Sequence, residues 1–199
     1  MNLHRVLRAI ENIRATDRPA TALAAAVRRV LKGPRVDAAL RGSWLGHPLH
    51  PLMVTVPIGA WVSAAVLDAG RANNDTARTL VAIGLAAAPP TVLLGLADYS
   101  GLDERQRRVG LVHAVVNTAA LSCYAASYAL RRREAHTAGK LLGALGLITL
   151  SAGGALGGHL SYAQGGGVHR WQPPLEVAAA ADGFTGTRLE TVPATTDRL

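Results

Sequence analysis

The sequence predicts an all-α integral membrane protein: an up-down bundle of four membrane-spanning helices, preceded by amphipathic N-terminal helices. Three observations predict this class. Of the 199 residues, 49% are hydrophobic and only 17% are charged, whereas soluble domains carry roughly 25% charged residues. The charges gather in the N-terminal segment, in three short connectors and in the tail. Four uncharged runs long enough to cross a membrane remain between them.

The four expected spans cover about residues 52–67, 79–97, 110–130 and 141–160, and none contains Lys, Arg, Asp or Glu. Barrel strands alternate in hydrophobicity over roughly ten residues, so runs this long indicate helices. A soluble bundle of four buried helices is the disfavoured alternative. Pro57 in the first span and Pro89-Pro90 in the second remove backbone donors, so kinks facing the bundle are expected.

Residues 1–44 predict a basic amphipathic segment at the membrane interface or in the cytoplasm. Apolar side chains recur at helical spacing with arginines between them: Leu3, Val6, Leu7 and Ile10. A second such stretch covers residues 20–32 and is expected to end at Gly33-Pro34. These helices either lie on anionic lipid or fold back as a cap on the bundle, and the pattern fits both.

Four spans make a multi-pass protein with both termini on one side of the membrane. The balance of Lys and Arg near the spans favours cytoplasmic termini and a plasma (inner) membrane location. The run at residues 131–133 is the main counter-evidence. The first span is the expected insertion signal, because no apolar core precedes it. The polar residues 171–199 predict a mostly disordered tail.

The net charge of +8 indicates an anionic lipid partner rather than nucleic acid. The basic residues flank apolar runs, and only 4% of residues are aromatic, which is too few for a base-stacking surface. A single cysteine excludes a disulfide scaffold. No nucleophile elbow or phosphate-binding glycine loop is present, so a hydrolase is disfavoured and an enzymatic role stays open.

Counting spans places four histidines and one carboxylate at the same end of the bundle. His47 and His50 precede the first span, and Asp98 closes the second. His113 lies near the start of the third span and His159 near the end of the fourth. Imidazole is the commonest metal ligand and an axial ligand of haem. The four histidines are therefore candidate ligands for haem b or, with Asp98, for a transition metal.

Two polar side chains are candidates for supporting these ligands. Asp98 could orient an imidazole through its second nitrogen, and Asn117 lies one turn from His113 on the same helix face. The glycines within residues 153–158 either permit close helix packing or make room for a flat cofactor beside His159. Three functions remain open: electron transfer with haem or a metal, metal handling, and a non-catalytic scaffold or assembly subunit whose histidine cluster is structural or carries protons.

Three motifs resemble those of domain of unknown function 2231 (DUF2231), an uncharacterised bacterial membrane-protein family. The first is LGHPLHPL at 45–52 with VPIG at 56–59, and the second is GLADY at 95–99 with RVGLVH at 108–113 and Asn117. The third is GGHLSY at 157–162 with GGGV at 165–168. The resemblance covers about residues 40–170 and implies a four-span membrane domain, which we place at residues 45–170.

The resemblance also raises electron transfer, because some relatives carry a Rieske-type iron–sulfur domain after the fourth span. It thereby suggests an iron–sulfur or other redox protein as a partner. A Rieske cluster needs two cysteines and two histidines. This chain has Cys123 alone, so it is expected to carry no such cluster itself.

Overall fold

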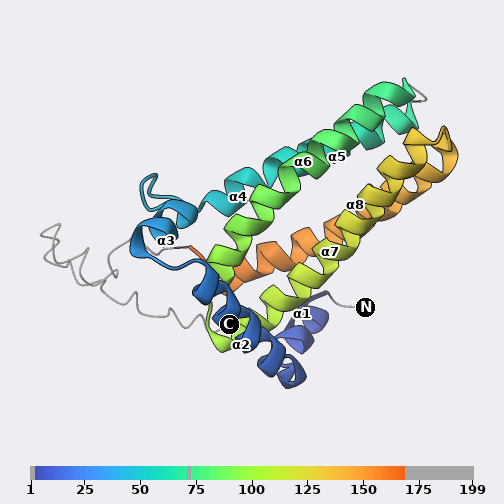
Figure 1. Ribbon diagram of the computed structural model, residues 1–199. Helices are drawn as coiled ribbons and strands as arrows, with labels where there is room; N and C mark the ends of the chain where they lie inside the picture. The colour runs from blue at the N-terminus through green and yellow to red at the C-terminus, as the bar shows by residue number, and fades with distance from the viewer. Residues whose placement is uncertain (1–2, 71–72, 169–199) are drawn as a thin grey trace, which may run out of the picture. The chain divides into compact units, whose positions relative to one another are not determined.

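The computed structural model describes residues 3–70 and 73–168, and their regular secondary structure is helical throughout (Figure 1). The tail at residues 171–199, expected to be mostly disordered, lies outside the described residues. Within the described ranges, four helices are long and apolar enough to cross a membrane. The predicted all-α, four-span class is therefore confirmed.

The first span consists of α4 (Leu49–Met53) and α5 (Thr55–Ala69), and the second is α6 (Asn74–Tyr99). The third is α7 (Glu104–Arg132), and the fourth is α8 (His136–Gly158) extended by a π-helix, η2 (His159–Ala163). Each span is longer than its uncharged run because the backbone hydrogen-bond ladder continues into the charged ends. The connectors are correspondingly short, as an up-down bundle requires.

The middle of the bundle is held by an aromatic stack between α5 and α7. Trp61 and Tyr124 are buried, with ring centroids 4.0 Å apart and planes 9° from parallel. Gly84 and Gly146 make room for these rings: a Cβ at Gly84 would lie 2.2 Å from the Trp61 indole nitrogen, and one at Gly146 would lie 3.0 Å from the Tyr124 ring. Small residues thus bring the helices close together, as is common in membrane bundles.

Pro57, Pro89 and Pro90 all lie within regular helical segments of the first two spans. The helix is interrupted at Val54, between α4 and α5, and Pro57 lies in the first turn of α5. A proline is tolerated there because its missing N–H would lack a helical partner anyway. α6 stays helical through Pro89 and Pro90, whose side chains are exposed rather than directed into the bundle.

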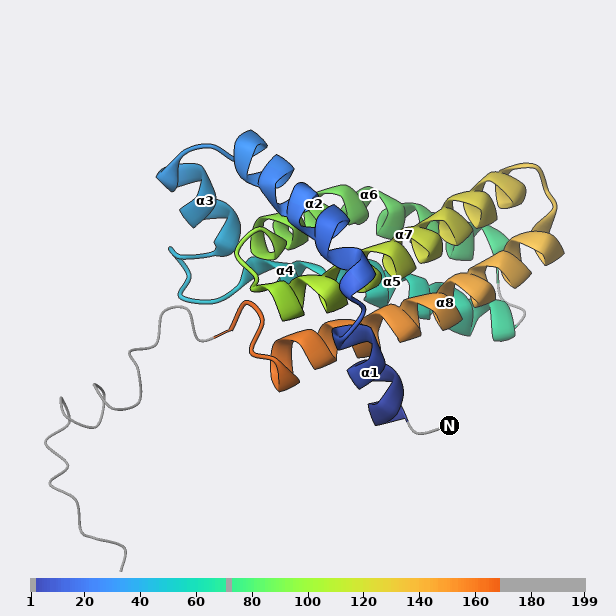
Figure 2. The same cartoon turned by 90° about the horizontal axis from the view of Figure 1, so that it is seen from below.

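The N-terminal segment forms α1 (Leu3–Glu11), η1 (Arg14–Thr16), α2 (Asp17–Val30) and α3 (Pro34–Arg41). Helix α2 crosses α6 and α7 near the ends that carry Tyr99 and Glu104 (Figure 2). Ala20 and Ala24 of α2 are buried in a cluster with Tyr99 and Leu102. Gly33-Pro34 ends α2 as expected, but it also starts α3, with the proline in the first helical turn.

Candidate functional site

His50 is directed from the short helix α4 toward α6. Pro48 is the extended residue before α4, so His50 falls in the first turn of the helix. Its Nδ1 lies 2.9 Å from the main-chain carbonyl oxygen of Thr91. Gly95, one turn further along α6, makes room for the ring: a Cβ there would lie 2.9 Å from His50 Cε1.

His113 is held in the same way between α7 and α8. Its Nδ1 lies 2.9 Å from the carbonyl oxygen of Gly153, and a Cβ at Gly157 would lie 2.9 Å from its Cε1. Asn117 donates to the His113 carbonyl at 2.8 Å, and a Cβ at Gly153 would lie 2.6 Å from its amide. The glycines at 153 and 157 therefore accommodate protein side chains, whereas a Cβ at Gly154 would meet open space.

The structure brings His50 and His113 together, with ring centroids 6.5 Å apart and planes at 85°. A carbonyl oxygen can only accept a hydrogen bond, so Nδ1 of each ring carries its hydrogen. In the neutral state each Nε2 then has a lone pair. The Asn117 amide nitrogen approaches Nε2 of His113 at 3.4 Å, which is too long for a strong hydrogen bond. The pair therefore presents two Nε2 lone pairs that can accept a proton or a metal ion.

The other two candidate histidines, His47 and His159, lie in different surroundings from this pair. His47 precedes α4 and is exposed. His159 begins η2, and its Nε2 lies 2.5 Å from Glu11 Oε1. Within residues 3–70 and 73–168, no group of three or more His, Cys, Asp or Glu side chains is placed to hold a metal ion. His159 is thus paired with Glu11 of the N-terminal segment, whereas His47 lies on the exposed stretch before α4.

The orienting role expected of Asp98 is filled, for His50 and His113, by main-chain carbonyls. Asp98 is half-buried on α6, three residues after Gly95. The carbonyl oxygens of Thr91 and Gly153 contact the Nδ1 atoms that a supporting carboxylate would have contacted. Asn117 does lie beside His113, as its spacing along the helix predicts.

Sequence reasoning missed Glu11, which links the N-terminal segment to two spans. Its carboxylate is buried and accepts hydrogen bonds from Arg105 of α7 and from His159. Burial alone would raise the pKa of Glu11. The hydrogen bonds from Arg105 and His159 lower it by more than burial raises it, so the net pKa is below the ordinary 4.5. The available signal was weak, because Glu11 is one of three carboxylates in the basic N-terminal segment and nothing in the sequence sets it apart.

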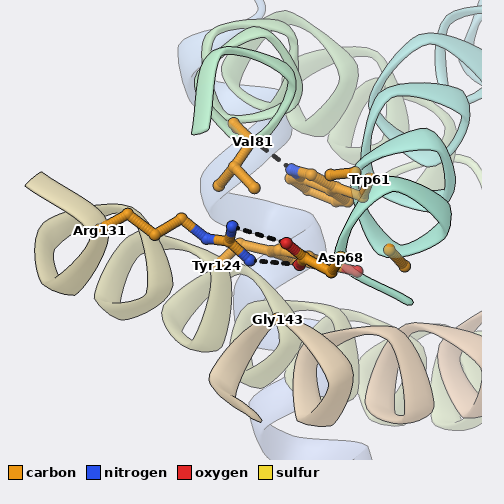
Figure 3. A pocket seen from close by; sticks show the side chains of 8 residues that line it. Trp61, Asp68, Val81, Tyr124, Arg131 and Gly143 are labelled. Carbon is orange, nitrogen blue, oxygen red and sulfur yellow. Dashed lines mark hydrogen bonds and ion pairs between the residues drawn. The ribbon is translucent and has the colours of Figure 1, made fainter. Parts of the chain in front are cut away.

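A second polar cluster lies at the opposite end of the bundle (Figure 3). Arg131 is fully buried and makes a bidentate pair with Asp68, with Nη1–Oδ1 3.0 Å and Nη2–Oδ2 2.5 Å. Its Nε donates to Ser127 at 3.2 Å, and Ser127 donates to the carbonyl of Gly139 at 2.6 Å. Arg131 is thus a buried ion-pair partner rather than the connector charge that the sequence suggested.

Comparison with known proteins supports the resemblance seen in the three motifs. A family model described as "Predicted membrane protein (DUF2231)" matches residues 46–170. No curated protein and no solved structure matches the chain. The matched region contains all four spans and the His50–His113 pair, whereas helices α1, α2 and α3 precede it.

Proposed function

The chain belongs to the DUF2231 family of predicted membrane proteins, and from that premise we propose that it binds a transition-metal ion between His50 and His113 for electron transfer in the membrane. The Nε2 atoms of both rings are the proposed ligands. The observation that carries this proposal is the anchoring of both Nδ1 atoms to main-chain carbonyls at 2.9 Å.

Anchoring of this kind is the usual second contact of a metal-binding histidine. A ligating imidazole almost always donates its other N–H to a carboxylate or a backbone carbonyl, which fixes the ring and raises its basicity. Ionisable residues are also rare within membrane spans, and those that occur there commonly mark functional sites. Two rings with the same anchoring, 6.5 Å apart, fit a site that shares one cation.

The ligand set favours an exchangeable or redox-active ion over a structural one. Imidazole suits copper, iron, zinc and nickel. Two protein ligands leave coordination positions open, whereas structural zinc sites are closed by protein side chains. Gly95 and Gly157 hold the rings against two helix backbones, an arrangement that suits a compact ion better than a haem, whose macrocycle needs an open slot.

The test is metal analysis and a visible spectrum of detergent-purified protein, oxidised and then reduced, from cells supplied with metals and a haem precursor. We expect bound metal in the wild type and a loss of most of it in His50→Ala and His113→Ala. His136→Ala is the matched control, because His136 pairs with Glu134 at the far end of the bundle. A Soret band lost in the same variants would instead identify haem iron. Equal metal content in all four proteins, with no Soret band, would reject the proposal.

A scaffold or assembly role is the second candidate, and one observation favours it. Each histidine joins two helices: His50 joins α4 to α6, and His113 joins α7 to α8. Under this alternative the same two substitutions lower the melting temperature while the preparation contains neither metal nor haem. The metal analysis and a thermal melt on the same samples therefore separate the two functions.

We also propose a plasma-membrane location with both termini in the cytoplasm. The buried pairing of Arg131 with Asp68 weakens the main counter-evidence, because this charge is not part of the connector. A reporter enzyme active only in the cytoplasm, fused after Leu199, should be active. An inactive reporter there, with an active one inserted at Glu134, would reverse the proposed orientation.

A further inference from the structure

The two amphipathic N-terminal helices differ in what covers their apolar faces. Helix α2 buries Ala20, Ala24 and Val27 in contact with the bundle. In α1, by contrast, Val6, Leu7 and Ile10 form a stripe at helical spacing, and none of the three is buried. The apolar face of α1 is therefore only partly covered by the described protein.

The C-terminal end of α1 is fixed at the level where two spans end. Glu11 is bonded to Arg105 and His159, and its carbonyl oxygen accepts from Arg108 at 3.1 Å. Arg105 and Arg108 lie at the start of the third span, and His159 lies near the end of the fourth. Helix α1 contacts α7, and Figure 2 shows it at a steep angle to the long axes of α7 and α8. These contacts place the C-terminal end of α1 beside the ends of the third and fourth spans.

The polar face of α1 and its neighbours carries an excess of exposed cations. The carboxylates of the segment are each paired with an arginine: Glu11 with Arg105, Asp17 with Arg108, and Asp37 with Arg41. The exposed cations of the same segment are Arg5, Arg8, Arg14, Arg18, Arg28, Arg29, Lys32 and Arg35. This surface is complementary to anionic phospholipid headgroups.

We propose that α1 is an interfacial helix of the membrane that the bundle spans, and that Arg5 and Arg8 bind anionic phospholipid headgroups. Val6, Leu7 and Ile10 lie at the boundary between headgroups and acyl chains, as the apolar face of an interfacial helix does. Helix α2, in contrast, packs its apolar face on α6 and α7 and caps the bundle. A helix as short as α1 is marginal on its own, so the Glu11 contacts and the lipid together hold it in place.

The test places a solvent-sensitive fluorophore on the apolar stripe. Leu7→Cys is labelled in a Cys123→Ala background and reconstituted into phosphatidylcholine vesicles with or without phosphatidylglycerol. Ala26→Cys, on the exposed face of α2, is the matched control, and Val6→Cys provides a second stripe position if Leu7→Cys folds poorly. We expect bluer emission and several-fold weaker quenching by acrylamide at the stripe than at Ala26. Phosphatidylglycerol should increase the difference, and Arg5→Gln with Arg8→Gln should remove that increase.

Three results would overturn the inference. Equal quenching at the stripe and at Ala26 would show that α1 lies in water. Protection that needs high protein concentration would show that a second copy of the chain covers the stripe. A stripe protected equally in both vesicle types would exclude the headgroup contacts of Arg5 and Arg8.

Discussion

The two ends of the bundle each bury a polar cluster, and they differ in how completely its hydrogen-bonding groups are used. At one end the Arg131 guanidinium and the Asp68 carboxylate make two mutual bonds, and Ser127 accepts a third. At the other end His50 and His113 are each anchored through one ring nitrogen to a carbonyl. A closed ion pair holds helices together, whereas an anchored imidazole keeps an Nε2 lone pair for chemistry.

The largest effect is expected at the end of the bundle that carries the Arg131–Asp68 pair, which we call the closed end; the end with His50 and His113 is the open end. Asp68→Ala leaves the fully buried Arg131 without its counter-ion, which costs about 3–5 kcal/mol when a buried pair loses one partner. A thermal melt in detergent should show a large drop or no folded protein. Asp75→Ala is the control, because Asp75 is exposed and its pair with Arg78 is worth roughly 0–1 kcal/mol. Similar melting temperatures for both variants would mean that the Arg131–Asp68 pair does not hold this end of the bundle together.

A smaller effect is expected from disturbing one ring of the open end. Gly157→Ala adds a Cβ about 2.9 Å from His113 Cε1, so the ring must leave the Gly153 carbonyl, at an overpacking cost of about 1–3 kcal/mol. Melting temperature and metal content should both fall. Gly154→Ala should change neither, because its Cβ would point into open space. If Gly157→Ala behaves like Gly154→Ala, the glycine does not position the histidine.

The weakest expected effect is a loss of thermal stability in acid, where Glu11 would lose its contacts with Arg105 and His159. The folded pKa of Glu11 is below its ordinary 4.5, so its contribution is present above that pH and is lost as the pH falls through the lower folded value. Melting temperature should therefore decrease below about pH 4.5, and less so in Glu11→Gln. Asp17 titrates in the same direction because its hydrogen bond with Arg108 lowers its pKa, so part of the dependence should persist. An identical acid profile in Glu11→Gln would assign the effect to other carboxylates.

The sequence predicted the spans and the end of the bundle on which the histidines lie. Both follow from the charge distribution and from counting helices. It did not predict which histidines pair, because that depends on the rotation of each helix and on which glycine leaves room for a ring. The Glu11–His159 contact joins residues 148 positions apart, and the Asp68–Arg131 pair joins residues 63 apart. Local periodicity carries no information about contacts over such separations.

Nitrogen-15 NMR of histidine-labelled protein in bilayers tests the central claim most directly. Resonances assigned by their absence from His50→Ala and His113→Ala should show, near neutral pH, Nδ1 protonated and Nε2 unprotonated for both residues. Added transition-metal ions should perturb Nε2 of both rings together. A hydrogen on Nε2 of either neutral ring would contradict the anchoring described for the open end, and with it the proposed cation site.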